Sequence, residues 1–263
     1  MPSHEDTVQQ QFKLQARSFE DPGYAFADRR LMGWIFEHVP GEPGAGVLDV
    51  AGGTGHMARA YADTAAVAVV LDLTPEMLAT GLREAAAAGL SNVVFVLGNA
   101  AEMPFLDASF DLVVSRFAVH HFVQPERQIA EMARVCRPGG RVAIIDLVAA
   151  DEALAAEHDR LERLRDPSHA RALSQRELSQ LLAEAGAPVE HETSREQSLA
   201  LERWLAQAQA PQEVARVIRE ELETELGGGA PSGMRPSKSD GELQLTQRWA
   251  ILVARKPAIA ASG

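Results

Sequence analysis

Two acidic residues and a group of glycines are the residues whose spacing best fits ligand chemistry. Residues 47–58, VLDVAGGTGHMA, run from an apolar segment into a helical pattern, and Asp49 lies inside the apolar part. The turn between them holds Gly52, Gly53 and Gly55. Because glycine lacks a Cβ, such a turn can bring its backbone close to a ligand. A second acid, Asp72, ends the next apolar segment about 20 residues after the glycines, a spacing typical of nucleotide sites.

Two cofactor classes fit this pattern. Gly53, Gly55 and Ala58 satisfy the G-x-G-x-x-G/A motif of dinucleotide-binding proteins, and Asp72 could bind ribose hydroxyls in either class. Asp49 favours the second class, because a carboxylate beside a pyrophosphate is unfavourable, whereas one beside an ammonium group is stabilised. S-adenosylmethionine carries an ammonium, a sulfonium and a ribose but no phosphate. The alternative is that Asp49 only binds the backbone of its own loop.

Two adjacent histidines, His120 and His121, follow another apolar segment. A histidine near neutrality can remove a proton from a phenol, an amine or an acidic carbon, so both are candidate catalytic residues. Neighbouring positions point in different directions, which is not the spacing of metal ligands, and no metal site is predicted. The alternative is that His121 only braces its loop.

The elements that position these residues alternate between strands and helices. The predicted strands are 47–51, 66–73, 92–100, 110–117, 141–148, 189–197 and 245–257. Near-continuous apolar strands separated by helical segments predict an α/β fold, with a parallel sheet covered on both faces. Residues 125–140, PERQIAEMARVCRPGG, are predicted as one helix ending at glycine, with Cys136 on its face.

Four regions are predicted along the chain. Residues 1–45 form N-terminal helices that are part of a lid, and residues 46–150 form the cofactor-binding core. Residues 151–240 are a helical cover with one sheet strand. Residues 241–263 contain the final strand and a loose tail.

The composition limits the partners of the chain. It has 263 residues, a formal net charge of −12 and a single cysteine. The acidic charge argues against a nucleic-acid partner, and no apolar run is long enough for a membrane span. A single cysteine fits the reducing cytoplasm. We therefore expect a cytoplasmic monomer or homodimer with a small-molecule partner.

Five motifs resemble those of the class I S-adenosylmethionine-dependent methyltransferases, especially the small-molecule group around the ubiquinone/menaquinone C-methyltransferases. They are VLDVAGGTGHMA, VVLDLTPEML, GNAAEMPF, FDLVVSRFAVHHF and RVCRPGGRVAIID, in this order. The resemblance covers residues 8–148 and says little about the acceptor. It implies a doubly wound, Rossmann-like, mostly parallel sheet of seven strands, the last antiparallel, with a helical lid.

The resemblance also assigns roles to residues of the first two motifs. It implies that the loop wraps the methionine part of the cofactor, and that Asp72 holds both ribose hydroxyls. The loop residues are Asp49, Ala51, Gly52, Gly53, Thr54 and Gly55, with Thr54 a candidate for binding the cofactor carboxylate. Ala51 stands where many relatives have glycine, which predicts that this position needs no positive φ. Leu73 and Met77 are expected near the adenine.

The remaining motifs supply the rest of the expected cofactor site. Asn99 stands where relatives usually have aspartate, and its side-chain oxygen could accept from the adenine amino group. Ala100 would offer its backbone N–H, and Ala101 belongs to the same loop. The backbone at Ser115 is expected near the cofactor ammonium.

Arg116 is expected to contact a cofactor or substrate carboxylate, or else to form a salt bridge under the lid. Phe19 occupies a position where relatives have tyrosine, and its ring could lie against the sulfonium. Tyr24 could replace the missing hydroxyl.

The resemblance implies transfer of a methyl group from S-adenosylmethionine to an O, N or C atom of a small metabolite. Two alternatives remain open. One is a cyclase or regulatory protein that binds the cofactor without methyl transfer. The other, weaker, is an NAD(P)-dependent oxidoreductase.

Overall fold

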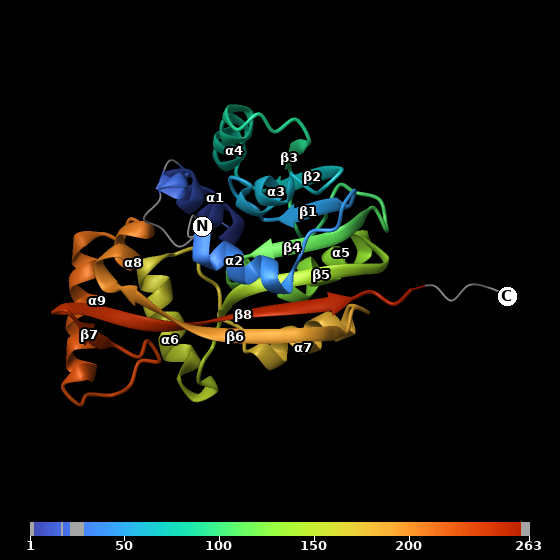
Figure 1. Ribbon diagram of the computed structural model, residues 1–263. Coiled ribbons are helices and arrows are strands. Elements are labelled where there is room, and N and C mark those ends of the chain that lie inside the picture. Colours follow the sequence, from blue (N-terminus) through green and yellow to red (C-terminus); the bar gives the residue numbers. More distant parts are fainter. Residues whose placement is uncertain (1–2, 17, 22–28, 259–263) are drawn as a thin grey trace.

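The computed structural model describes residues 3–16, 18–21 and 29–258, and its central element is one eight-stranded sheet. The strands are β1 (Gly46–Val50), β2 (Val67–Asp72), β3 (Val93–Leu97), β4 (Phe110–Arg116), β5 (Cys136–Val148), β6 (Val189–Ala200), β7 (Ser237–Ser239) and β8 (Glu242–Arg255). Their order is β3-β2-β1-β4-β5-β8-β6, with β7 paired to β8. The first five strands are parallel, and β8 runs antiparallel to β5, β6 and β7 (Figure 1).

Helices connect these strands and flank the sheet. The α-helices are α1 (His4–Gln15), α2 (Arg29–His38), α3 (His56–Tyr61), α4 (Pro75–Ala87), α5 (Pro125–Val135), α6 (Ala155–Arg165), α7 (Gln175–Glu184), α8 (Leu201–Gln207) and α9 (Gln212–Leu226). Short 3₁₀ turns occur at η1 (Ser18–Glu20), η3 (Val119–His121) and η4 (Glu152–Leu154). Within the described residues, no helix is both long and apolar enough to cross a membrane.

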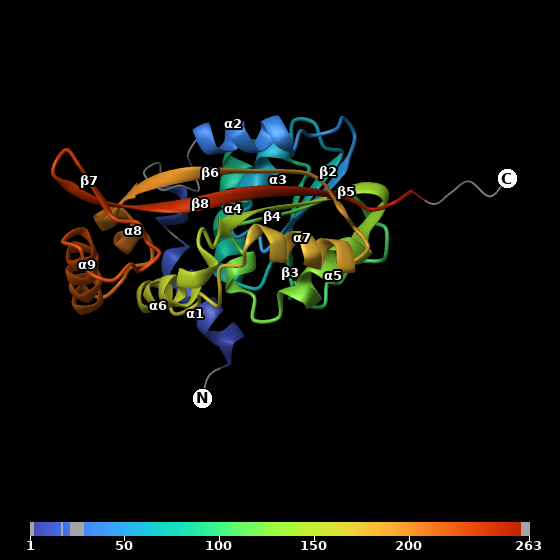
Figure 2. The ribbon, with the colours of Figure 1, turned by 90° about the horizontal axis from the view of Figure 1, so that it is seen from below.

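The central strands β1, β2, β4 and β5 are buried on both faces, and their successive residues point to opposite sides of the sheet. Val47 packs into the cluster that holds α2, α3 and α4, whereas its neighbour Leu48 packs into the cluster that holds α5 and α7. Figure 2 shows α2 and α7 on opposite sides of the strands. This double cover explains why the core strands are apolar along their whole length.

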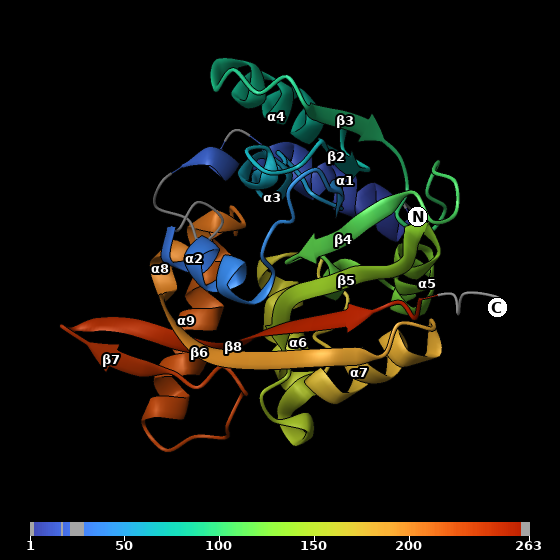
Figure 3. The ribbon, with the colours of Figure 1, turned by 45° about the vertical axis from the view of Figure 1, so that its right-hand side comes forward.

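The end of the sheet near β7 carries a third, smaller hydrophobic cluster. β6 and β8 extend past the parallel strands and pair with each other along their length. Helices α6, α8 and α9 pack there, around Trp204, Leu205 and Ile218 (Figure 3). The helical cover predicted from the sequence therefore has its own hydrophobic core.

The predicted fold class is confirmed, with two corrections to its elements. An eighth strand, β7, is present in addition to the seven predicted strands. The helix predicted over residues 125–140 ends at Val135, and Cys136 begins β5 instead of lying on a helix face. The RPGG sequence after Cys136 forms an irregularity within β5, where the pairing with β4 shifts register.

The strand order reverses at β1, since β2 and β4 lie on its two sides. Chain connections leave in opposite directions at such a point, and a crevice opens beyond the carboxyl ends of the strands. The fold therefore places the ends of β1, β2 and β4 around one site.

Candidate functional site

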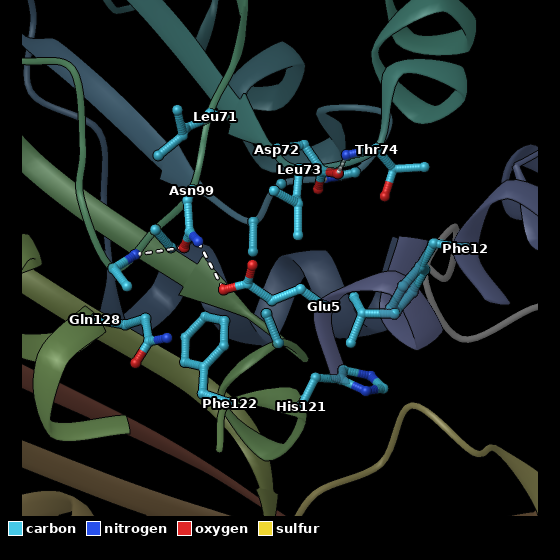
Figure 4. A pocket seen from close by; sticks show the side chains of 18 of the residues that line it. Glu5, Phe12, Leu71, Asp72, Leu73, Thr74, Asn99, His121, Phe122 and Gln128 are labelled. Carbon is cyan, nitrogen blue, oxygen red and sulfur yellow. Dashed lines mark hydrogen bonds between the residues drawn. The ribbon is translucent and has the colours of Figure 1, made fainter. Parts of the chain in front are cut away.

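A cavity of about 370 Å³ lies at the carboxyl ends of β1 to β4, within the size range of small-molecule sites. Its walls come from α1, η1, the loops after these strands, and the start of α5. The lining residues are Ser3, His4, Glu5, Val8, Phe12, Phe19, Asp49, Ala51, Gly52, Gly53, Met57, Leu71, Asp72, Leu73, Thr74, Gly98, Asn99, Ala100, Ala101, Arg116, Phe117, Ala118, His121, Phe122, Val123, Gln124, Arg127 and Gln128. Figure 4 shows 18 of these side chains around the cavity and labels ten of them.

The loop after β1 is tightly folded. Ala51, Gly53 and Gly55 all have positive φ, at 51°, 58° and 79°. A Cβ on Gly52 would lie only 2.6 Å from the carboxyl carbon of Asp49, so only glycine fits there. The expectation that Ala51 needs no positive φ is wrong, because the chain turns through the left-handed region before the first glycine.

Replacing Ala51 with glycine should relieve this backbone strain. A left-handed alanine costs about 1–2 kcal/mol, and the extra unfolded-state entropy of glycine offsets about 0.5–1 kcal/mol of that gain. We expect Ala51→Gly to raise the melting temperature by about 1–4 °C in a thermal denaturation experiment. Ala100→Gly, at a cavity alanine without positive φ, is the control and should lower it. A lower melting temperature for Ala51→Gly would contradict the conclusion that the backbone at Ala51 is strained.

Asp49 is buried, with a relative exposure of 1%, at the floor of this loop. Its Oδ2 accepts a hydrogen bond from the backbone N–H of Ala58 at 3.1 Å, which ties the carboxylate to the first turn of α3. Its Oδ1 is buried without a hydrogen-bond partner among the described residues. Burial raises the pKa of Asp49 to about 7, although the Ala58 N–H and the charge of Arg116 oppose the shift. A buried carboxylate oxygen beside a cavity is suited to a cationic ligand group.

Asp72 lies at the end of β2 and organises the neighbouring backbone. Its Oδ2 accepts from the N–H of Gly53 at 2.8 Å, and its Oδ1 accepts from the N–H of Thr74 at 2.8 Å. Burial raises its pKa despite these bonds. Its carboxylate lines the cavity beside Leu73, as a ribose-binding acid would, whereas Met77 is buried behind the loop and does not line it. Figure 4 shows Asp72, Leu73 and Thr74 along one wall.

Arg116 ends β4 and lines the cavity opposite the glycine loop. It is buried, and burial lowers its pKa to about 10 while the charge of Asp49 opposes the shift, so the guanidinium remains protonated at neutral pH. The preceding residue, Ser115, points away from the cavity and donates to the carbonyl oxygen of Val50 at 3.0 Å. That bond joins the ends of β4 and β1, so Ser115 supports the loop.

Phe19 is held over the glycine loop by contacts from α3. The ring of His56 lies 3.2 Å from the Phe19 carbonyl oxygen, and Arg59 donates to both carboxylate oxygens of Glu20 at 2.8 Å. The Phe19 ring then lies 3.5 Å from the place where a Cβ on Gly53 would be. A Cβ at that place would make only an ordinary van der Waals contact with the ring, so the positive φ of Gly53, and not the approach of Phe19, favours glycine there. Tyr24, the other aromatic candidate, lies outside the described residues.

Asn99 follows β3 at the other end of the cavity. Its Oδ1 accepts from the N–H of Ala101 at 2.8 Å, and its Nδ2 donates to Glu5 of α1 at 2.8 Å (Figure 4). Ala100 and Ala101 line the cavity at the same place. The structure thus brings the predicted adenine loop to the cavity and adds a carboxylate that the motif did not predict.

The two histidines have different surroundings. His121 lines the cavity, and its Nδ1 lies 2.9 Å from the carbonyl oxygen of Ser168. A carbonyl oxygen only accepts, so Nδ1 donates and the lone pair of the neutral ring is on Nε2. Burial and the nearby charge of His120 lower the pKa of His121 to about 3, so the ring stays neutral near pH 7. His121 can therefore accept a hydrogen bond but is a weak base.

His120 does not line the cavity. Its Nδ1 lies 2.5 Å from Oδ1 of the buried Asp146. The other carboxylate oxygen of Asp146 accepts a hydrogen bond from the N–H of Val119. Burial acts to lower the pKa of His120, but attraction to Asp146 and their hydrogen bond outweigh it and raise the pKa. His120, the more basic histidine, therefore lies behind the cavity wall, whereas the less basic His121 is part of that wall.

The buried pair predicts a pH-dependent contribution to stability. Because the folded-state pKa of His120 is raised, its stabilisation is complete below its ordinary pKa of about 6.5 and is lost as the pH rises past the raised value. We expect His120→Gln to lower the free energy of unfolding by about 3 kcal/mol at pH 6 and by less at pH 9, measured by denaturant titration. The exposed His191→Gln is the control. An equal loss of unfolding free energy at both pH values would contradict a charged His120–Asp146 pair.

Several predicted cofactor-binding and catalytic residues do not line the cavity. Thr54, Gly55, Met77, Ser115 and His120 lie behind it, where they pack against or hydrogen-bond to its walls. The predicted lining residues that the structure brings together are Phe19, Asp49, Ala51, Gly52, Gly53, Asp72, Leu73, Asn99, Ala100, Ala101, Arg116 and His121. The lining described for this cavity contains no residue after Gln128, so residues 151–240 contact its walls from outside, at His121 through the carbonyl oxygen of Ser168 and also through α1. Gln11 of α1 donates to the carbonyl oxygen of Ala208, at the end of α8.

Sequence reasoning missed the residues that α1 and α5 contribute. His4, Glu5, Gln124, Arg127 and Gln128 line the cavity, yet they belong to polar helix ends that read as solvent-exposed. The only available signal was the capping sequence Ser3-x-x-Asp6, which places the start of α1 but not its packing against the core.

Comparisons with known proteins agree with this geometry. A methyltransferase domain model matches residues 48–144. The uncharacterized methyltransferase YcgJ of Bacillus subtilis is 34% identical over 62% of this chain and 64% of its own. The uncharacterized protein YafE of Escherichia coli K12 is 30% identical over 60% of this chain and 77% of its own.

The chain belongs to the class I S-adenosylmethionine-dependent methyltransferases. Solved structures with the same fold superpose over most of this chain. A Bacillus halodurans protein assigned as a methyltransferase is 27% identical, with a TM-score of 0.79 over 86% of this chain and 99% of its own. The cyclase SpnF, 21% identical with a TM-score of 0.70, shares the fold over 98% of both chains.

The sequence matches leave part of each relative uncovered: this chain aligns with 64% of YcgJ and with 48% of the demethylmenaquinone methyltransferase of Renibacterium salmoninarum. The cofactor of the family is S-adenosylmethionine. The residues fit it: Asp49 has a free buried oxygen for an ammonium, Arg116 a charge for a carboxylate, and Asp72 two acceptor oxygens for a ribose.

Proposed function

We propose that this protein transfers a methyl group from S-adenosylmethionine to an O, N or C atom of a small metabolite. The observation that supports this most directly is the pair of opposite charges that Asp49 and Arg116 present to one end of the cavity. An amino-acid moiety carries an ammonium and a carboxylate, which would face the carboxylate of Asp49 and the guanidinium of Arg116. A dinucleotide would instead bring a pyrophosphate to an unpaired carboxylate.

The order of the other lining residues supports a cofactor whose amino-acid end lies beside Asp49 and Arg116. Asp72 follows the charged pair, and Asn99 lies beyond it at the end of β3. The cavity thus offers groups for an amino acid, a ribose and a base along one line of parallel strand ends. Phe19, over Gly53, is placed for contact with a sulfonium by a cation–π interaction.

The acceptor is proposed to enter on the side lined by Phe12, His121 and Phe122. The rings of Phe12 and His121 meet edge to face, with their centroids 5.0 Å apart. These side chains exclude water and position an apolar or aromatic metabolite, and Nε2 of His121 can accept a hydrogen bond from its reacting group. When bound, S-adenosylmethionine supplies a methyl group already activated by a positive sulfur, so alignment is the main task of the protein.

Two measurements test this function. Calorimetry on the full chain should detect one S-adenosylmethionine per molecule. A metabolite extract incubated with cofactor labelled in its methyl group should give a labelled product and stoichiometric S-adenosylhomocysteine. Binding with product formation but no S-adenosylhomocysteine would favour the cyclase alternative. If neither S-adenosylmethionine nor S-adenosylhomocysteine binds, the proposal is contradicted.

A further inference from the structure

Glu5 of α1 lies at the mouth of the cavity and touches the loop after β3. Its Oε1 accepts a hydrogen bond from Nδ2 of Asn99 at 2.8 Å, although the two residues are 94 positions apart in the sequence. Figure 4 shows the Glu5 carboxylate between Asn99 and Phe122, inside the ring of lining side chains. This contact joins the N-terminal helix to the part of the cavity proposed for the base.

The orientation of the Asn99 amide follows from its other contact. The backbone N–H of Ala101 can only donate, so the atom facing it at 2.8 Å must be the amide oxygen. The amide NH₂ of Asn99 therefore points toward Glu5. At this end of the cavity Asn99 presents donors, and the carboxylate of Glu5 presents the acceptor beside them.

Adenine has a matching edge, because its 6-amino group donates and the adjacent ring nitrogen accepts. We propose that Glu5 accepts a hydrogen bond from the 6-amino group of the cofactor, while the second N–H of Asn99 is directed to the ring nitrogen. Glu5 is thus a specificity-determining residue that favours a 6-amino base over a 6-oxo base. This inference rests on the proposed function.

Several contacts hold α1 in a position that keeps Glu5 at the cavity. Lys13 forms an ion pair of 2.7 Å with Glu76 of α4, and Gln9 donates to the carbonyl oxygen of Leu73 at 2.8 Å. At the start of the helix, Nε2 of His4 lies 2.9 Å from the carbonyl oxygen of His121. The carboxylate is therefore carried by a helix that is attached to two cavity walls.

The test compares S-adenosylhomocysteine with its 6-oxo analogue, S-inosylhomocysteine, by calorimetry on the full chain. The wild type should prefer the 6-amino compound by at least about tenfold, the size expected for one hydrogen bond to a charged group. Glu5→Gln should lose part of that preference, because a glutamine amide can donate to a 6-oxygen, whereas the N–H of Asn99 still disfavours the protonated ring nitrogen of the 6-oxo base. The matched control is Glu76→Gln, which removes the ion pair between α1 and α4 outside the cavity and should keep the preference.

Each other outcome overturns the inference. An unchanged preference in Glu5→Gln would show that Glu5 does not contact the base. Tighter binding of S-adenosylhomocysteine by Glu5→Ala would show that the carboxylate competes with the base. If the wild type binds neither compound, both the inference and the proposed function fail, whereas the first two outcomes leave the proposed function intact.

Discussion

Asp49→Asn is expected to abolish detectable binding of S-adenosylmethionine while making the ligand-free protein more resistant to unfolding at pH 8. The carboxylate is buried at 1% exposure, and one of its oxygens has no hydrogen-bond partner among the described residues. The charged carboxylate therefore destabilises the ligand-free protein and is favourable only beside a cation. Asparagine removes the charge and keeps an oxygen for the N–H of Ala58.

The stability gained by Asp49→Asn should increase as the pH rises. Because burial raises the pKa of Asp49 to about 7, the folded protein holds this proton more firmly than the unfolded chain does. The stability of the ligand-free wild type therefore falls as the pH rises from about 4 to about 7. Denaturant titration should find Asp49→Asn more stable by about 2 kcal/mol at pH 8, with the difference shrinking toward pH 4.

The control for Asp49→Asn is Asp63→Asn, which removes the same charge from an exposed position after α3. It should leave both stability and cofactor affinity close to those of the wild type. If Asp49→Asn were less stable than the wild type at pH 8, or bound the cofactor normally, the assignment of Asp49 as the ammonium-binding residue would be wrong.

Asp72→Ala is expected to weaken cofactor binding about 30-fold, equivalent to about 2 kcal/mol, through loss of charge-assisted hydrogen bonds to the ribose. Alanine also leaves the N–H groups of Gly53 and Thr74 without their acceptor, which loosens the loop. Calorimetry with S-adenosylhomocysteine gives the affinity.

Asp72→Asn is the matched variant for this prediction. It retains one acceptor oxygen and the shape of the side chain, and it should have an affinity between the wild type and Asp72→Ala. Equal affinities for all three proteins, each shown to be folded by circular dichroism, would mean that the ribose lies elsewhere.

The parts of the site that could be predicted from the sequence are those fixed by local pattern. Strand ends follow from apolar runs, and parallel strands bring their carboxyl ends to one edge, so Asp49, Asp72, Asn99 and Arg116 had to converge. Glycines after the first strand marked the tight turn correctly. These features depend on spacing along the chain and on few long-range contacts.

The parts that could not be predicted depend on tertiary packing. The positive φ of Ala51 contradicts the residue preference, and the loop imposes it around the Asp49 carboxylate. β7 forms from Ser237–Ser239 only because β8 extends beyond the core to pair with it. The position of Glu5 depends on how α1 docks against α4 and the end of β2, which no periodicity in α1 encodes.

The most direct test of the account is calorimetric titration of the full chain with S-adenosylhomocysteine and with NAD⁺ at pH 6 and pH 8. We predict one bound S-adenosylhomocysteine, an affinity about tenfold higher at pH 8, and proton release at pH 6 as Asp49 ionises beside the ligand ammonium. NAD⁺ should give no heat of binding. Binding of NAD⁺ without S-adenosylhomocysteine, or an affinity for S-adenosylhomocysteine that does not change with pH, would contradict the role given to Asp49.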